Sequence, residues 1–597
     1  MDPVTHVRAE YTTRLDARRM EHASWSRRDE QIAWSRLAVF GIAVVIAFLA
    51  WSNAASWWWL IAPLFAFIAL VRWHDVVIER RLAAANVVLF YERGLARLDD
   101  RWIGAGSTGD RLLDPEHLYA ADLDLFGRGS LFELLSLART GAGEELLGAW
   151  LSHPATPEVV RQRQEAVDEL TGRLDLRELL WSIGGDVAAS VRPDTLSSWA
   201  TSPPALPAWL QPVSLLLTAS VIAAGVFGAL SDDYTPLFVV LAIEGVVLYR
   251  YFATVSAVLH VAASWSRELD VLGRLLAILE HQTFESPMLA ELVGRLEASG
   301  AVPSGAIRRL HRLSEMHDWQ HNVIFAAIST PLLWGAHIAL AMERWRARHG
   351  GSVQVWLSTV ATIEALASLA AYRYEHPDDV WPEIVADTEA HLEGTGLGHP
   401  LLPSTHMVRN DVAFGPGRRL FIVSGSNMSG KSTMLRTIGV NVVLAFAGAP
   451  VRAASFVVTP LRLGATLRIQ DSLQEGRSRF FAEITRVKRI ADQAKDTPPT
   501  LFLLDELFHG TNSHDRLAGA CGVLRALVER GAIGLVTTHD LALVSIAEHL
   551  PKAVNVHFED RFEGGTMTFD YVMKAGPVTS SNAVALMRSV GLEVDQP

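Results

Sequence analysis

The sequence has 597 residues, too many for one hydrophobic core, so we expect three or more structural units. Half of the residues are hydrophobic, and a mean hydropathy of +0.20 is high for a soluble protein, which indicates a membrane portion. The net charge of −12 excludes a globally basic chain, although it leaves a local basic face open. The single cysteine, Cys521, excludes an internal disulfide and a cysteine-rich zinc site, and it suits a reducing cytosolic compartment.

The N-terminal region predicts a membrane hairpin. Residues 1–36 are polar and rich in arginine, so we expect a cytoplasmic segment and no signal peptide. The stretch 37–71 then contains no charged residue, and its middle reads SNAAS followed by three tryptophans. Two apolar arms around a polar turn predict a transmembrane hairpin over 37–73. Because each arm has only about 16 residues, a re-entrant or interfacial hairpin is the alternative.

A second hairpin is predicted inside a helical core. The helical spacing of apolar residues predicts a core in two parts, 74–212 and 253–395. Between them, 213–252 forms two apolar arms around the acidic turn SDDYT. Glu244 lies within the second arm, where a carboxylate is costly; it marks a function, faces a protein partner or snorkels towards water.

Charge placement predicts the orientation of both hairpins. Arginines follow each apolar region, whereas the turns at 52–56 and 231–235 carry neither lysine nor arginine. The positive-inside rule therefore predicts a protein of the inner (cytoplasmic) membrane with both termini in the cytoplasm. The apolar run 322–342 would add a crossing, so we expect it and 354–371 to be two buried helices of the cytoplasmic core.

The strongest chemical signal begins at residue 421, in a region where short β runs alternate with helices. Gly425 to Ser432 fit the pattern G-x-x-x-x-G-K-[ST] between an apolar strand and a helix, the context that a phosphate-binding P-loop requires. The loop and helix N-terminus should bind the phosphates of a nucleotide, and the hydroxyl of Ser432 should ligate Mg²⁺. The predicted contact residues are Gly425, Asn427, Ser429, Gly430, Lys431, Ser432 and Thr433.

Two further strands end in polar residues. The strand TLFLL ends in Asp505 and Glu506; we expect Asp505 to hold Mg²⁺ through water and Glu506 to polarise the attacking water. An ordinary exposed acidic pair is the alternative. The strand AIGLVTT ends in His539, which is placed to contact the γ-phosphate, although such a histidine alone is more often a plain loop residue.

Together these motifs resemble the MutS family of ABC-type ATPases. The likeness rests on GSNMSGKSTMLRTIG, DSLQEGRSRFFAEI, LLDELFHGTNSHD and TTHD, and it reaches over 110–200 and 262–597. The resemblance implies a multidomain α plus α/β protein: transmembrane helical hairpins, an all-α lever core, and a C-terminal P-loop ABC-type ATPase domain over 396–597. It also implies Mg²⁺-dependent ATP hydrolysis and, by family, binding and repair of mismatched DNA.

The resemblance further implies a homodimer with two composite ATP sites. One subunit supplies Lys431, Ser432, Asp505, Glu506 and His539, and the segment Thr511–Asp515 reaches the γ-phosphate of the partner's ATP, with Ser513 and Asp515 as its contact residues. The family's adenine-stacking aromatic is not obvious, because His406 and Met407 occupy that neighbourhood.

The chain departs from the family where DNA would be recognised. We expect the N-terminal mismatch-recognition domain with its Phe-x-Glu wedge to be missing, since the first hairpin occupies 1–110. The second hairpin stands where the family's DNA clamp is inserted, and no basic stripe with interleaved aromatics is evident. The alternative function is an ABC-type membrane ATPase that acts on the envelope or a protein partner and has no DNA role.

Overall fold

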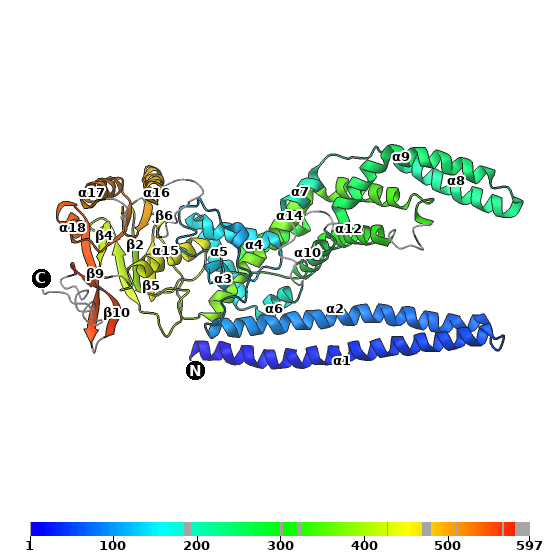
Figure 1. Ribbon diagram of the computed structural model, residues 1–597, viewed down its shortest axis with the longest axis horizontal. Helices are drawn as coiled ribbons and strands as arrows, with labels where there is room; N and C mark the ends of the chain where they lie inside the picture. Colours follow the sequence, from blue (N-terminus) through cyan, green and yellow to red (C-terminus); the bar gives the residue numbers. More distant parts are fainter. Residues whose placement is uncertain are drawn as a thin grey trace.

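The protein is elongated, with the α/β domain at one end and the tips of two helical hairpins at the other (Figure 1). Most of the chain is helical and two mixed sheets lie in its C-terminal part, which confirms the expected combination of α and α/β regions. The computed structural model describes residues 2–183, 193–263, 265–298, 300, 302–319, 325, 328–387, 389–426, 428–467, 479–508, 512–563 and 566–578.

Hairpin 1 consists of α1 (Pro3–Trp51), a short 3-10 turn (Trp57–Leu60) and α2 (Ile61–Leu98). The helix α1 continues through residue 36 without a break, so its polar and apolar halves form one rod of about 74 Å. Near the turn its large apolar side chains are exposed, with Trp51 80% and Phe48 71% accessible. At the base it packs through a separate cluster that includes Tyr11, with α6 and the end of α14.

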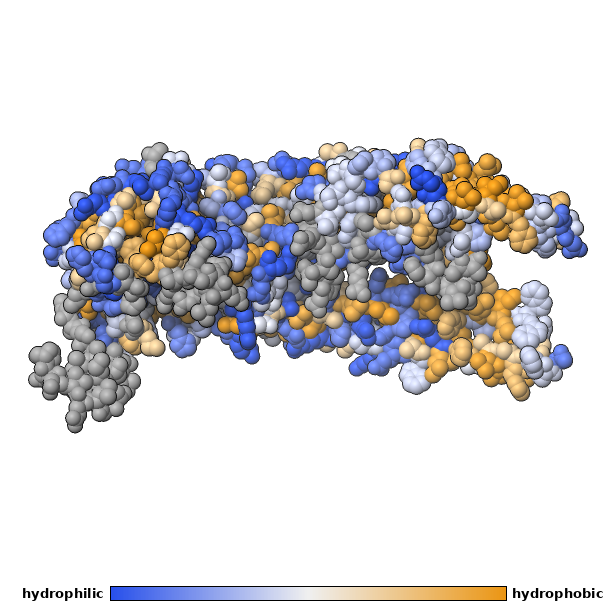
Figure 2. Space-filling model, turned by 45° about the horizontal axis from the view of Figure 1, so that its top comes forward, coloured by the Kyte–Doolittle hydropathy of each residue, from blue (hydrophilic) through white to orange (hydrophobic). Residues whose placement is uncertain are grey.

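Hairpin 2 consists of α8 (Leu210–Ser231) and α9 (Thr235–Ala263). Its outward side chains are also apolar and exposed, among them Leu230 and Val246. Figure 2 shows these hydrophobic residues gathered towards the far ends of both hairpins, whereas hydrophilic residues cover much of the α/β domain. Glu244 is buried within this hairpin, and its Oε1 has no hydrogen-bond partner among the described residues.

The helical body surrounds one long helix, α14 (Trp334–Glu375), which packs against α4, α5, α7 and α12. Five described helices are long and apolar enough to cross a membrane, but the apolar window of α14 is 78% buried, against 6–28% in the hairpin helices. The burial predicted for 354–371 is therefore confirmed, and that predicted for 322–342 is confirmed for residues 334–342, since part of this run lies outside the described residues. The prediction of two helices is wrong, because 334–342 and 354–371 belong to one helix. The remaining body helices are α3 (Leu131–Leu135), α4 (Gly141–Ser152), α5 (Pro157–Thr171), α6 (Leu174–Ser182), α7 (Pro193–Thr201), α10 (Ser266–Leu279), α11 (Pro287–Glu297) and α12 (Pro303–Asp318).

The continuity of α14 has a packing reason. Gly350 and Gly351 lie in its middle, where glycine ordinarily weakens a helix by roughly 1 kcal/mol. A Cβ atom at Gly350 would lie 2.1 Å from the carbonyl oxygen of Ala200 in α7, so only glycine permits this approach. The helix therefore passes α7 in direct backbone contact instead of ending there.

The α/β domain is built on a six-stranded sheet of order β10-β9-β4-β8-β7-β6, in which only the β9–β10 pair is antiparallel. Alternate residues of β7 contribute to two hydrophobic clusters, one shared with α15 and one shared with α16 and α17. A second sheet has the order β1-β5-β2-β3. The strands are β1 (Glu383–Ile384), β2 (Leu392–Leu397), β3 (Asn410–Phe414), β4 (Leu420–Ser424), β5 (Ser455–Val458), β6 (Arg462–Thr466), β7 (Thr500–Leu504), β8 (Ile533–Thr538), β9 (Ala553–Glu563) and β10 (Thr566–Ala575); the helices are α15 (Lys431–Ala447), α16 (Arg479–Gln493), α17 (Ser513–Glu529), α18 (Leu541–Val544) and α19 (Ile546–His549).

A Phe-x-Glu tripeptide does occur in the N-terminal region, at residues 90–92, contrary to the sequence-based expectation. Phe90 is 2% exposed and packs against the ring of Trp181 with 6.0 Å between the ring centroids. It therefore belongs to the base of hairpin 1 and does not present an exposed wedge.

Candidate nucleotide-binding site

The P-loop connects β4 to α15 and curls around its own lysine. Gly430 has a φ of +105°, in the left-handed region that favours glycine, and α15 begins at the next residue. The Nζ atom of Lys431 donates to the carbonyl oxygens of Gly425 at 2.9 Å and Ser426 at 2.6 Å. Ser429 also donates to Ser426, at 2.8 Å. The loop therefore presents the start of α15, where backbone N–H groups attract anions.

Lys431 is poised for an anionic partner. Burial lowers the pKa of its ammonium group, and the nearby carboxylates of Glu506, Asp505 and Asp560 oppose this shift. Desolvation disfavours the charged lysine, so an added negative charge beside it restores the protonated form. Both the backbone geometry and the charge of the loop therefore suit a phosphate group.

The P-loop serine and the first strand-end carboxylate lie together. The hydroxyl of Ser432 donates to Oδ2 of Asp505 at 2.6 Å, and the hydroxyl of Thr537 donates to Oδ1. The strands β4, β8 and β7 are adjacent and parallel, so their carboxyl ends bring these residues to one edge. A hydroxyl and a carboxylate are oxygen ligands that suit Mg²⁺, which also uses water and substrate phosphates. No larger cluster of potential metal ligands occurs among the described residues.

The two proposed catalytic groups also meet. The Nδ1 atom of His539 lies 3.4 Å from Oε1 of Glu506, and each side chain is partly exposed. The backbone N–H of Glu506 donates to the hydroxyl of Thr537 at 3.0 Å, which fixes the strand end at a φ of +49°. Glu506 therefore faces the space beside the P-loop, with His539 positioned behind it.

A cavity of about 640 Å³ opens beside these groups. Tyr571 of β10 stands on its rim, and a Cβ atom at Gly430 would lie 3.1 Å from the Tyr571 ring. Asn410 holds this tyrosine by donating to its carbonyl oxygen at 3.0 Å. The described lining residues are Leu397, His399, Leu402, His406, Met407, Val408, Asn410, Met428, Gly430, Lys431, Ser432, Thr433, Met434, Thr437, Glu506 and Tyr571.

Tyr571 is the aromatic residue that sequence reasoning missed. The family resemblance places a base-stacking aromatic shortly before the P-loop, where His406 and Met407 line the cavity instead. Tyr571 follows the P-loop by about 140 residues in sequence and reaches it because β10 pairs antiparallel with β9. An exposed tyrosine in a strand at the end of the resembling region was the available signal.

The remaining predicted contacts are not gathered at this cavity. Asn427 and Thr511 lie outside the described residues, as does the side chain of Ser513. Asp515 accepts a hydrogen bond from Asn512 at 2.7 Å in the first turn of α17 and does not line the cavity of its own chain. Among these predicted contacts, only Asp515 can therefore be assigned a place, and it lies outside the cavity.

The P-loop, the two strand ends and Tyr571 fall within one family match. Residues 421–594 match the sequence model of the family described as MutS domain V. This part of the chain is therefore similar to the MutS family, and we call it the MutS domain. A relative in Halobacterium salinarum, DNA mismatch repair protein MutS 2, is 34% identical over 244 residues. That alignment covers 40% of this chain and 28% of the relative, so the chain spans less than a third of its relative's length.

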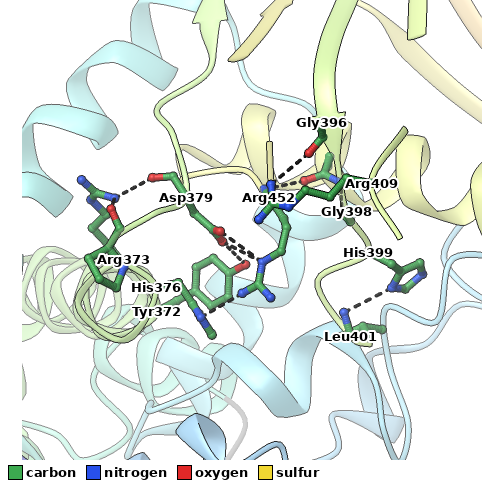
Figure 3. A network of polar contacts seen from close by, with 12 residues as sticks. Tyr372, Arg373, His376, Asp379, Gly396, Gly398, His399, Leu401, Arg409 and Arg452 are labelled. Carbon is green, nitrogen blue, oxygen red and sulfur yellow. Dashed lines mark hydrogen bonds and ion pairs between the residues drawn. The ribbon is translucent and has the colours of Figure 1, made fainter. Parts of the chain in front are cut away.

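A buried polar network joins the MutS domain to the helical body (Figure 3). Asn441 of α15 accepts a hydrogen bond from the backbone N–H of Arg452 at 2.8 Å. The guanidinium of Arg452 donates to Asp379 and contacts Nδ1 of His376 at 2.8 Å, just beyond the end of α14. The helix that begins at the P-loop is thus connected by direct contacts to the longest helix of the body.

The same end of α14 holds the base of hairpin 1. Arg97 of α2 forms two hydrogen bonds of 2.6 Å with the carboxylate of Glu375, and both side chains are buried. Tyr11 of α1 donates to Glu375 at 3.2 Å. The residues from Glu375 to Asp379 therefore lie between the MutS domain on one side and hairpin 1 on the other.

Proposed function

We propose that this protein is a membrane-tethered ATPase whose MutS domain binds ATP with Mg²⁺ and hydrolyses it. The observation that carries the proposal is the placement of Ser432 and Asp505, 2.6 Å apart at the start of α15, beside the buried Lys431. A P-loop lysine, a hydroxyl and a strand-end carboxylate in this arrangement are the parts that nucleotide hydrolysis requires.

Each residue has a distinct role in this proposal. Lys431 and the N-terminus of α15 bind the phosphates, and Ser432 and Asp505 hold the metal ion, which neutralises phosphate charge. Glu506 accepts a proton from the attacking water, and His539, 3.4 Å away, orients that carboxylate and reaches the γ-phosphate. Tyr571 stacks on the base.

Substitution of Glu506 tests the assignment. In Glu506→Gln the amide cannot accept the proton, so ATP turnover should fall by about 10²–10⁴-fold while nucleotide affinity stays unchanged. Turnover is measured by phosphate release and affinity with a fluorescent ATP analogue. Glu529→Gln, at an exposed position of the same domain, is the control. Normal turnover in Glu506→Gln would refute the role.

The exposed apolar surfaces of the two hairpins support a membrane location. In α1, the exposed Trp34 and Trp51 lie about 26 Å apart along the helix, close to the hydrocarbon thickness of a bilayer. In hairpin 2, α8 is about 33 Å long. Tryptophans concentrate at both membrane–water interfaces. We place both hairpins in the inner (cytoplasmic) membrane, with the MutS domain in the cytoplasm.

A homodimer would complete the ATP sites. Asp515 lies at the start of α17, away from the cavity of its own chain. In the proposed dimer this segment reaches the γ-phosphate in the partner subunit, so ATP binding closes the two MutS domains on each other. Cross-linking that increases with ATP in Glu506→Gln would support closure, and nucleotide-independent cross-linking would contradict it.

A role in DNA repair is the second candidate. The halobacterial relative is named a DNA mismatch repair protein, which favours this function. Phe90 of the N-terminal Phe-x-Glu tripeptide is buried and both hairpins carry apolar ends, so hairpin 1 does not present this tripeptide as an exposed wedge. An envelope or protein substrate is the competing assignment. Preference for mismatched over matched duplex, measured with and without ATP, separates the two.

A further inference from the structure

A basic notch lies between two helices of the body, far from the ATP cavity. Arg309 of α12 and Arg344 and Arg348 of α14 surround a cavity of about 70 Å³, together with Ala341, Trp345 and His349. This volume exceeds what one water molecule needs, so a phosphate oxygen can enter it. On α12, the exposed Arg308 and Arg312 extend the basic surface beside the notch.

These five arginines lack the usual acidic neighbours. All are exposed, and none forms an ion pair within 4.0 Å with a described carboxylate. Glu343, the acidic residue closest in sequence on α14, is buried and paired with Arg346 at 2.5 Å. The notch therefore carries positive charge that no described carboxylate pairs with directly, in a chain whose net charge is −12.

The positive charge of these arginines also acts on two histidines of α14. Burial lowers the pKa of His349, and the positive charges of Arg348 and Arg309 lower it further. Burial likewise lowers the pKa of His337, with Arg344 adding to the effect. The notch therefore favours a negative ligand over a further cation.

Two tryptophans fix the register that creates this arrangement. Trp334 donates to the carbonyl oxygen of Met316 at 2.8 Å, and Trp345 donates to that of Ala306 at 2.7 Å. The two helices therefore run antiparallel, and Arg309 comes to lie opposite Arg344 and Arg348. Because Trp345 is buried and its N–H is bonded, it offers no stacking face for a base.

The position of the notch separates it from the lipid surface. Trp334 shares a cavity with Leu248 and Phe252 at the cytoplasmic end of hairpin 2. Arg344 and Arg348 follow Trp334 by about 15 and 21 Å along α14, on the side of the MutS domain. Both distances exceed the thickness of the headgroup layer, which is about 5–8 Å on each side of the hydrocarbon core, so a bilayer headgroup is a poor ligand.

From these observations we infer that the notch binds the phosphates of a nucleic-acid backbone without reading base sequence. Guanidinium groups from two helices match the oxygen pairs of a phosphodiester, and the flanking arginines engage neighbouring phosphates. The site supplies the second candidate function with a place where DNA would be held, and it does not depend on ATP hydrolysis.

The test uses the full-length protein in neutral nanodiscs and fluorescent single-stranded and duplex DNA. The variant Arg309→Ala/Arg348→Ala should weaken binding about tenfold or more at low salt for every sequence. The slope of log affinity against log salt should become shallower by about 0.9 per lost duplex contact. Arg309→Lys/Arg348→Lys should keep the slope and recover part of the affinity. Lysine retains the positive charge, but it cannot donate the paired N–H bonds of a guanidinium group.

The control is Arg295→Ala, an exposed arginine of α11 already paired with Glu291 at 2.6 Å. Lys431→Ala should lose ATP turnover and keep DNA binding. The two readouts therefore test the ATPase proposal and the notch independently. Absence of wild-type DNA binding at about 50 mM salt, or an equal salt slope in all variants, would overturn the inference. It would equally be overturned if the double variant changed only the preference for anionic nanodiscs, or only the capture of an acidic protein.

Discussion

The Nε atom of Arg452 lies 3.1 and 3.2 Å from the two carboxylate oxygens of Asp379, and both side chains are buried. Asp379 also accepts a hydrogen bond from Tyr372 at 2.8 Å. This pair joins a loop of the MutS domain to the end of α14, so it is a structural link between the ATP site and the body.

Breaking that pair should destabilise the junction. Removal of one partner in Arg452→Met leaves a buried charge uncompensated, which costs about 3–5 kcal/mol in unfolding free energy. Asp379→Asn should cost a similar amount, and the double variant should lose clearly less than the sum. Denaturant unfolding measures all three. Strictly additive losses would show that the two charges do not stabilise each other.

Tyr571 should determine the affinity for the nucleotide base. In Tyr571→Ala, loss of stacking should weaken ATP binding by about 1–3 kcal/mol, or roughly 5- to 150-fold, whereas Tyr571→Phe should bind nearly as tightly. Titration with ATP and with inorganic triphosphate separates base from phosphate binding, because the second ligand should not distinguish the variants. If Tyr571→Ala bound ATP as tightly as the wild-type protein, Tyr571 would not contact the base.

Glu364 should make stability depend on pH. It lies buried in α14, accepts a hydrogen bond from the N–H of Arg139 at 2.9 Å, and burial raises its pKa from 4.5 to about 7. Below pH 4.5 both folded and unfolded chains hold the proton. Between 4.5 and about 7 only the folded chain holds it, so stability falls as pH rises and stays reduced above 7.

The Glu364→Gln variant should remove this fall, which amounts to about 3 kcal/mol for a shift of this size. Unfolding midpoints at acidic and neutral pH, followed by tryptophan fluorescence, give the comparison. Glu291→Gln, at an exposed site on α11, should retain the wild-type pH dependence. If the unfolding midpoint of Glu364→Gln depended on pH as that of the wild-type protein does, a group other than Glu364 would cause the dependence.

The single cysteine makes the proposed topology directly testable. In a Cys521→Ser background, Ser52→Cys at the turn of hairpin 1 should react with an impermeant maleimide added outside the inner membrane. Thr13→Cys, near the base of the same hairpin, should react only after the membrane is opened. Labelling of both positions from outside, or release of the protein by carbonate, would contradict spanning.

The arrangement of the P-loop beside the two strand ends could be predicted from the sequence, because its parts are local. A strand, a glycine loop and a helix follow one another at 420–447, and strand ends carry Asp505 and His539 to the same edge. Tyr571 was not predictable in this way, because its place depends on the pairing of β10 with β9. The continuity of α14 was missed because the role of Gly350 depends on a backbone atom of α7.

The basic notch escaped the sequence for a related reason. Arg309 and Arg344 are 35 residues apart, and neither lies in a basic run long enough to suggest a binding surface. Their meeting depends on the antiparallel register that Trp334 and Trp345 impose through two backbone carbonyls. Local composition carries no information about such a register, whereas the packed pair of helices specifies it.

The 42 residues of α14 form a strut about 63 Å long, with its start beside hairpin 2 and its end in the network around Asp379. In a long, stiff helix, a small tilt at one end produces a large displacement at the other. A tilt of about 5° at the MutS domain displaces the opposite end by roughly 5 Å, comparable to one helical turn. Angular changes too small to disturb packing around the P-loop would therefore reach the base of hairpin 2 as translations of several ångströms, large enough to shift hairpin 2 past hairpin 1.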